Sequence, residues 1–389
     1  MPPTGKTGMH THIRVVTEYL TSVGVTVDLI TPFSWYKGLA VIIFGLRYIL
    51  EPISGTAGAL WYRFWHAVFL TRALRRTLSA NTSAVVYAQD PLSVRAALRA
   101  RVSPTQQVVG ILHFVGISEA DEWIDNGRFR ANSRADRQIR AQEANILPAA
   151  PRLIYLSEAR RRALLDTIPA LTRVPSEVIP NFLTSHGSSH PTSAAPLADL
   201  VTVGRLEPSK NHSFLLRVVA AARRLGTDLS LDIYGDGSLR AALLRDIETL
   251  KLSDLVRLHG FRRDLSLLLP RYTLYVHSAI KEGLPFALIE ALAAGLPIYT
   301  TKVGGIADLD STAGSIHFWT LQDADDAAAH LLAFLASPSA VTQARIASRN
   351  HFATTYHVDA VGPRLLQFLI PTHQSDSPHP PTSPDTTSQ

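Results

Sequence analysis

Short apolar runs alternate with amphipathic segments along most of the chain, a pattern typical of α/β proteins with parallel sheets. In the first half, the apolar runs predict buried strands, at 25–32, 84–90, 107–113 and 152–157. Apolar residues at helical spacing predict helices among them, at 9–22, 92–101 and 133–147. We therefore expect a Rossmann-like domain in this half.

The second half repeats the pattern. Apolar runs predict strands at 200–206, 230–237, 256–261, 272–278 and 296–301. Helical spacing predicts helices at 211–225, 237–249 and 285–294, and a last helix at about 341–369. Two similar α/β domains would leave a cleft between them, where ligands tend to bind.

Composition shifts suggest the domain boundaries. Residues 185–198 are rich in Ser, Pro and His and have no periodic apolar face, which predicts a linker. The linker would separate an N-terminal domain, 1–184, from a C-terminal domain, 199–340. The last helix would lie within 341–370, and the polar tail, 371–389, is predicted to be disordered.

The chain contains no cysteine, which excludes disulfides, thiolate metal sites and cysteine nucleophiles. Its most apolar run, Gly38 to Leu46, has nine residues, far fewer than the roughly 20 that span a bilayer. The N-terminus lacks the apolar core of a signal peptide. These features predict a cytoplasmic protein.

Charge is unevenly distributed. Residues 1–185 carry 21 Lys or Arg and 13 Asp or Glu, a net charge of +8, whereas the remainder carries −2. An anionic membrane surface or lipid phosphate would explain this excess, and so would an ordinary solvated basic surface. The basic residues form no arginine-rich arm, so we expect no nucleic-acid partner.

Residues 33–76 are unusually aromatic and basic. Such a segment suits peripheral contact with the inner face of a membrane, and packing of its aromatics on the N-terminal sheet explains it equally well. The sequence does not decide between these two alternatives.

The stretch from Lys281 to Ile298, KEGLPFALIEALAAGLPI, places Glu282 and Glu290 eight positions apart. Pro285 ends the preceding segment, and a helix should begin near Phe286. A turn between a strand and a helix collects backbone N–H groups and the positive end of the helix dipole, which suits a phosphate or a sugar. Spacing alone, however, favours two ordinary surface glutamates.

The surrounding residues resemble a known family. EGLPFALIEALAAGLPI, followed by TTKVGGIADL (300–309), resembles the Glu-x7-Glu region of family 4 glycosyltransferases, which have the GT-B fold of two facing Rossmann-like domains. VGRLEPSKNHSFLL (203–216) is similar to the donor-phosphate segment of that family, and VRLHGFRRDLSLLLPRYTLYVHSA to its nucleobase segment. The resemblance covers about 200–310, in the expected order.

The resemblance implies that Arg205 and Lys210 bind the diphosphate of a nucleotide-sugar donor. Two cations just beyond a strand end would stabilise the charge that develops on the leaving nucleotide. Phe261 would lie near the base through its backbone atoms, and a core position explains this aromatic almost as well.

The same resemblance assigns the glutamates. Glu282 would lie near the donor sugar as a catalytic-site residue, and Glu290 near the ribose. The backbone of the turn would lie against the sugar and phosphates, at Gly283, Leu284 and Pro285.

The first half resembles the family more weakly. His113, at a strand end, corresponds to a histidine presented to the donor sugar, and Gly8 to a glycine that lets the backbone approach the diphosphate. The family has a strand before this glycine, whereas only seven residues precede Gly8 here. We therefore hypothesise either a start further upstream or a decayed gene copy. One of the acidic residues of 119–125 would help to bind an acceptor sugar, but the sequence favours a solvated loop for this segment.

Together these features predict an enzyme that moves a sugar from a nucleotide-sugar to a glycan or lipid-linked acceptor with retention of configuration, in polysaccharide or glycolipid assembly. The family also implies that the last helix crosses back to the N-terminal domain, and that there is neither a cofactor nor an essential metal. The Asp-x-Asp within 323–326 suits a helix start instead. The alternative is an inactive GT-B protein that binds the donor without transfer.

Overall fold

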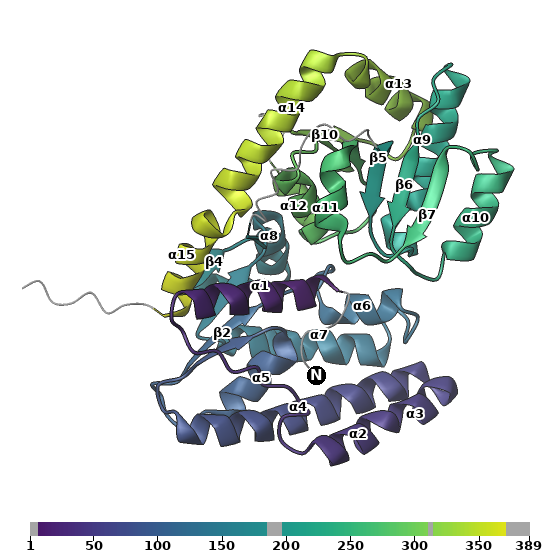
Figure 1. Cartoon of the computed structure of the whole chain (residues 1–389). Coiled ribbons are helices and arrows are strands. Elements are labelled where there is room, and N and C mark those ends of the chain that lie inside the picture. Colours follow the sequence, from purple (N-terminus) through teal and green to yellow (C-terminus); the bar gives the residue numbers. More distant parts are fainter. Residues whose placement is uncertain (1–6, 185–196, 310–313, 371–389) are drawn as a thin grey trace, which may run out of the picture.

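The computed structural model describes residues 7–184, 197–309 and 314–370 (Figure 1). It contains two parallel β-sheets, one in each half of the chain. Most of the predicted linker, 185–198, and all of the predicted tail, 371–389, lie outside the described residues.

The N-terminal half contains a four-stranded parallel sheet in the order β1-β2-β3-β4. Val108 and Val109 of β2 are fully buried, as expected of a strand covered on both faces. Polar caps begin the helices that follow strands, for example Asp90 before α5 and Ser157 before α8. The elements are α1 (Gly8–Ser22), α2 (Lys37–Gly45), α3 (Arg47–Ile53), α4 (Gly55–Ala80), β1 (Val85–Ala88), α5 (Pro91–Ala100), β2 (Gln107–Ile111), α6 (Glu119–Asp125), α7 (Arg134–Ile146), β3 (Arg152–Tyr155), α8 (Glu158–Thr167) and β4 (Ser176–Val178).

The strand predicted at 25–32 is wrong, because this segment forms no ladder. Val25 and Val27 pack against the core beneath α1, which explains the apolar pattern. A strand also needs a hydrogen-bonded neighbour, and among the described residues β1 is paired with β2 only.

The C-terminal half contains a six-stranded parallel sheet in the order β10-β9-β8-β5-β6-β7. From β5 the chain proceeds outward to β6 and β7, and then returns to β8 on the other side. The sheet therefore changes direction between β5 and β8, and such a switch point opens a crevice at the carboxyl ends of the strands. The elements are β5 (Ala198–Val203), α9 (His212–Arg224), β6 (Leu231–Tyr234), α10 (Arg240–Thr249), β7 (Val256–Gly260), α11 (Leu265–Leu268), β8 (Tyr272–Val276), α12 (Phe286–Ala293), β9 (Ile298–Thr301), β10 (Ile316–Trp319) and α13 (Ala324–Leu335).

The last helical segment is longer and less regular than the sequence predicted. It consists of α14 (Pro338–His351), a π-helical turn at Phe352–Tyr356, and α15 (Val358–Leu369). The π turn redirects the chain along the side of the molecule, so that α15 packs on α1 of the N-terminal half (Figure 1). Gly362 allows this approach, since a Cβ there would lie 2.6 Å from the ring of Tyr19.

The aromatic segment forms α2, α3 and most of α4. Phe44 of α2 and Phe69 of α4 are buried together, with Trp35, Tyr62 and Trp65 packed around them. The aromatics therefore pack mainly on one another between helices, while several neighbouring apolar residues remain exposed. None of the helices in the described part of the chain has the length and apolar character needed to cross a membrane.

Candidate active site

A cavity of about 940 Å³ lies between the two halves and opens at the carboxyl ends of β5 and β8. Every residue that the sequence singled out for the site lines it, namely Gly8, His113, Arg205, Lys210, Phe261, Glu282, Gly283, Leu284, Pro285 and Glu290. Positions as far apart in the chain as Gly8 and Glu290 thus meet at the topological switch point, where a ligand is expected.

Glu282 is the most strongly held of these side chains. It is buried, and Oε2 forms an ion pair with Lys210 Nζ. The same oxygen lies 3.5 Å from His277 Nε2, and Oε1 accepts a hydrogen bond of 3.2 Å from the N–H of Gly283. Burial alone would raise the pKa of Glu282, but His277 and the charge of Lys210 outweigh it and lower the pKa to about 2. Glu282 is therefore an anion throughout the neutral range.

Glycines shape the turn around Glu282. At Gly304, which has a positive φ of 51°, a Cβ would lie 1.8 Å from the carbonyl oxygen of Glu282. At Gly305 a Cβ would lie 2.9 Å from the carbonyl oxygen of Gly283. Because only glycine permits this contact, the VGGI segment packs directly behind the Glu282 turn and fixes its position.

The remaining donor-side residues lie on three elements. Arg205, two residues after β5, has Nη1 2.8 Å from Glu207 Oε1. Phe261 follows β7, and its side chain is 40% exposed, so it is not a core aromatic. Its N–H donates to Asp236. Glu290 lies one turn into α12, and burial raises its pKa while Arg14 opposes part of the rise.

The N-terminal half contributes the start of α1 and the end of β2. Gly8 begins α1, and a Cβ on it would lie 3.7 Å from the ring of Phe286, the first residue of α12. Two helix N-termini, each with unpaired N–H groups and a positive dipole end, therefore meet at the cavity. An anionic group is favoured at this point.

His113 is held as a neutral imidazole. Its Nε2 donates a hydrogen bond of 3.0 Å to Gln89 Oε1, which leaves Nδ1 as an acceptor. Burial and the neighbouring His12 lower the pKa of His113 well below its ordinary value. His12 itself is a structural residue, because it is buried and bonded to Asn181 and Tyr87. His113 is thus suited to accept a hydrogen bond from a sugar hydroxyl.

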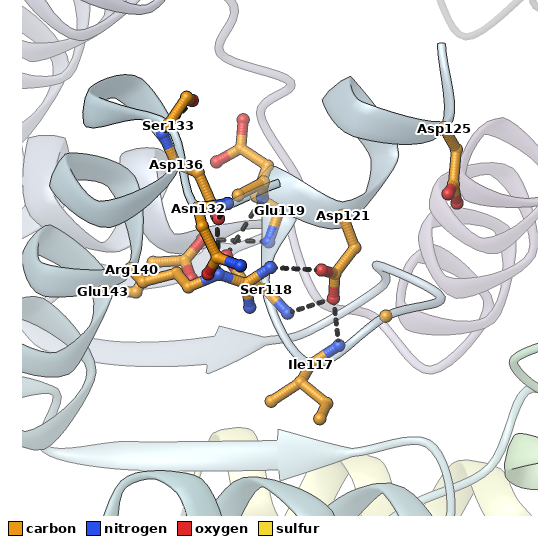
Figure 2. Close-up of polar contacts among 12 residues, drawn as sticks. Ile117, Ser118, Glu119, Asp121, Asp125, Asn132, Ser133, Asp136, Arg140 and Glu143 are labelled. Carbon is orange, nitrogen blue, oxygen red and sulfur yellow. Dashed lines mark hydrogen bonds and ion pairs between the residues drawn. The ribbon is translucent and has the colours of Figure 1, made fainter. Parts of the chain in front are cut away.

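The acidic residues of 119–125 form α6, not a solvated loop. Figure 2 shows Asp121 closing a capping box, with Oδ2 accepting from the N–H groups of Ile117 and Ser118. Arg140 pairs with the other oxygen of Asp121. Asp121 is therefore structural, whereas Glu122 and Asp125 line the cavity.

Beneath α6, Glu143 accepts a hydrogen bond of 3.0 Å from the N–H of Glu119, and burial raises the pKa of Glu143 to about 7 (Figure 2). A carboxyl whose pKa rises on folding stabilises the folded state below its ordinary pKa of 4.5, and this contribution is lost as the pH passes 7. Between pH 5 and pH 8 the free energy of unfolding of the wild type should fall by on the order of 2 kcal/mol through Glu143. The variant Glu143→Gln should not show this fall, because its side chain does not ionise. Thermal midpoints across that range test it. A parallel pH dependence in wild type and variant would contradict it, and Glu248→Gln, at an exposed glutamate of α10, is the control.

Three contacts between the two halves of the chain were not predicted from the sequence. Lys281 Nζ lies 2.7 Å from Asp125 Oδ2, Asn181 donates to the carbonyl oxygen of Leu284, and Asp308 accepts from the N–H of Ala159. His277 was also missed. Its place at the carboxyl end of β8, directly before the Glu282 turn, was a usable signal.

Within the described ranges, no group of three or more His, Cys, Asp or Glu side chains is arranged to hold a metal ion. Asp323 caps the N-terminus of α13, as predicted from its sequence position. The positive groups at the cavity are instead side chains and helix ends, and the arrangement can bind a diphosphate next to a sugar.

Two family models match the chain. Residues 6–185 match Glycosyltransferase Family 4, and residues 193–351 match Glycosyl transferases group 1. Among curated relatives, the chain is 34% identical over 152 residues to the GtfA subunit of a UDP-N-acetylglucosamine–peptide N-acetylglucosaminyltransferase from Streptococcus gordonii, covering 37% of this chain and 29% of that protein. It is 36% identical over 102 residues to a diphospho-undecaprenol 4-alpha-N-acetylgalactosaminyltransferase from Campylobacter jejuni, covering 26% and 27%. The matches thus span less than a third of the length of these relatives.

Solved structures share the fold. Sucrose-phosphate synthase from Thermosynechococcus elongatus superposes with a TM-score of 0.69 at 15% identity, covering 94% of this chain and 95% of that one. TarM from S. aureus superposes with a TM-score of 0.61 at 19% identity, covering 77% and 58%. Together with the family models and the two facing parallel sheets, these similarities show that the chain belongs to the GT-B superfamily of glycosyltransferases.

Proposed function

We propose that the chain is a retaining glycosyltransferase of the Glu-x7-Glu type, which transfers a sugar from a UDP-sugar to a glycan or lipid-linked acceptor. The observation that carries this proposal is the meeting of Arg205, Lys210, Glu282 and Glu290 in one cavity at the switch point of the C-terminal sheet. A role in polysaccharide or glycolipid assembly follows from the same acceptor class.

In the proposed complex, the diphosphate lies between Arg205, Lys210 and the N-termini of α1 and α12. Glu290 accepts hydrogen bonds from the ribose hydroxyls, and Glu282 and His113 accept them from the donor sugar. Lys210 shares its charge between Glu282 and the diphosphate. These groups supply the electrostatic stabilisation that transfer requires, and no bound metal is part of the proposal.

Transfer breaks the bond between the anomeric carbon and the diphosphate oxygen, and forms a bond from that carbon to the acceptor oxygen on the same face. The acceptor proton passes to the leaving phosphate oxygen. Arg205 and Lys210 stabilise the charge that develops on this oxygen, and the protein holds both substrates in position.

The choice of UDP is supported by the relatives. The S. gordonii relative is named for a UDP-linked sugar, and the solved structures of TarM and of HepE from Anabaena are complexes with UDP. HepE superposes with a TM-score of 0.63 at 18% identity, covering 77% of this chain and 81% of that one.

The proposal is tested by incubating the protein with a panel of UDP-sugars and following UDP release and the sugar product by NMR. We expect release from one UDP-sugar, a product that first appears with the donor's anomeric configuration, and no change on adding EDTA. An inverted product would contradict the retaining mechanism. Nucleotide-sugar binding without release, with acceptor glycans and lipid-linked acceptors present, would favour the inactive alternative.

We expect Glu290→Ala to weaken UDP binding about tenfold, because the ribose loses a charge-assisted hydrogen bond worth about 1.5 kcal/mol or more. Calorimetric titration with UDP measures the effect. Glu248→Ala, an exposed glutamate of α10 outside the cavity, serves as the control. Equal affinities of wild type and Glu290→Ala would remove Glu290 from the site.

A further inference from the structure

Helices α2 and α3 present a continuous row of exposed apolar side chains. Leu39, Ile42, Leu46, Ile49 and Ile53 follow one another at intervals of three and four residues, so they lie on one side of the helix pair. Their exposure ranges from 38% at Leu46 to 79% at Ile53. We call these five residues the outward stripe.

The opposite side of the helix pair explains why the stripe faces outward. Ala40 and Phe44 are buried against Phe69 of α4, which fixes the rotation of α2. In Figure 1, α2 and α3 form the outermost layer of the N-terminal half, on the side away from the C-terminal half. No described element covers the stripe, since all five residues are exposed.

The width of the apolar face distinguishes between possible occupants. A stripe of alternating three- and four-residue intervals alone would suit the narrow seam of a coiled coil. Here exposed Val41 and Tyr48 add a second row beside the stripe, and exposed Tyr36 precedes α2. A wide apolar face with tyrosines at its edge suits insertion into a membrane interface, where an aromatic ring lies in the apolar zone and its hydroxyl in water.

The charges around the stripe are complementary to an anionic surface. Residues 33–80 contain six Lys or Arg and a single acid, Glu51. Glu51 is neutralised by Arg47 at 3.8 Å and Arg128 at 3.1 Å. Exposed Lys37 begins α2, and exposed Arg130 follows the Arg128 that packs on Gly55, just beyond the end of the stripe. Basic groups thus lie at both ends of the apolar face.

A cavity of about 670 Å³ beside Gly55 extends the basic end. Arg128 and Arg130 line it together with Thr56. The cavity is open to solvent, and its lining residue Thr56 follows exposed Ile53 by three positions in the chain, so that an anionic headgroup has guanidinium groups within reach near the end of the apolar face.

We infer that the outward stripe and its flanking basic residues dock the protein on an anionic phospholipid surface. With nine and seven residues, α2 and α3 are too short to cross a bilayer, so they would lie in the plane of the interface. The inference does not depend on the donor chemistry, but it would bring the cavity to a lipid-linked acceptor if the proposed function holds.

Sedimentation with vesicles of phosphatidylcholine, with and without phosphatidylglycerol, tests the inference. We expect binding to the anionic vesicles, weaker binding at higher salt, and little binding to the neutral ones. The double variant Ile42→Glu/Ile49→Glu should bind anionic vesicles at least about tenfold more weakly, since two charges enter the apolar face. Ile346→Glu, at an isoleucine of α14 that is 53% exposed, is the matched control and should bind like wild type.

Three results would overturn the inference. They are recovery of the wild type entirely in the supernatant, sedimentation of the double variant to the same extent as the wild type, and a dimer on gel filtration that the double variant breaks. The last result would assign the stripe to a second copy of the chain. Ile42→Ser/Ile49→Ser repeats the test with a milder change if the glutamates prevent folding. The UDP affinity of the double variant should equal that of the wild type, so that a loss of vesicle binding is distinguished from a failure of the proposed function.

Discussion

A Lys210→Ala variant is expected to lose sugar transfer by about 100- to 1000-fold. Lys210 has two roles, because it forms the ion pair with Glu282 and lies where the leaving diphosphate would develop charge. Its removal also takes away one of the two influences that hold the pKa of Glu282 near 2, so the pKa of this buried carboxyl should rise. The variant should therefore lose further activity as the pH falls, whereas the wild type should not lose activity through Glu282.

Steady-state rates of UDP release across pH measure both effects. Lys302→Ala, an exposed lysine that does not line the cavity, is the matched control and should retain full activity. Lys210→Arg keeps the charge and should restore part of the rate. A Lys210→Ala enzyme with the wild-type rate and pH profile would contradict the proposed role.

An Arg63→Ala variant is expected to lower the free energy of unfolding by about 3 kcal/mol. Arg63 projects from α4, is almost fully buried, and pairs with Glu119 at the start of α6. Loss of the guanidinium leaves the Glu119 carboxylate without its ion-pair partner in a largely buried position, and such a group costs more than a lost surface pair.

Urea titration followed by tryptophan fluorescence measures the change. Arg76→Ala removes an exposed arginine from the same helix and should change the stability by less than about 0.5 kcal/mol. UDP affinity should stay unchanged in both variants, because neither residue lines the cavity. Equal stabilities of the two variants would show that the Arg63–Glu119 pair does not hold α6.

Much of the fold was predictable because parallel strands are buried on both faces. Runs such as those of β6 and β9 are fully buried, and their apolar character is visible in the sequence without knowledge of the partner strands. The segment at 25–32 has the same apolar pattern but only packs on the core, since pairing depends on a neighbour that local sequence does not reveal.

The site was predictable to the extent that strand ends determine it. Arg205 and Glu282 each follow a strand of one parallel sheet. The carboxyl ends of parallel strands lie on the same edge of the sheet, so the two residues had to lie on that edge. The Lys210–Glu282 pair and the Lys281–Asp125 contact were not predictable, because they depend on side-chain direction and on how the halves face each other. The role of α6 escaped for a similar reason: its capping box is local, but its buried partners, Arg63 and Glu143, come from α4 and α7.

The central claim is that the cavity at the switch point binds the UDP part of a sugar donor. Calorimetric titration of UDP, GDP and ADP into the wild type and into Arg205→Ala tests it most directly. We predict one UDP bound per chain, more tightly than GDP or ADP, and clearly weaker binding of UDP to Arg205→Ala, which remains folded. A folded wild type that binds no nucleotide, or an Arg205→Ala variant that binds UDP as well as the wild type, would contradict the claim.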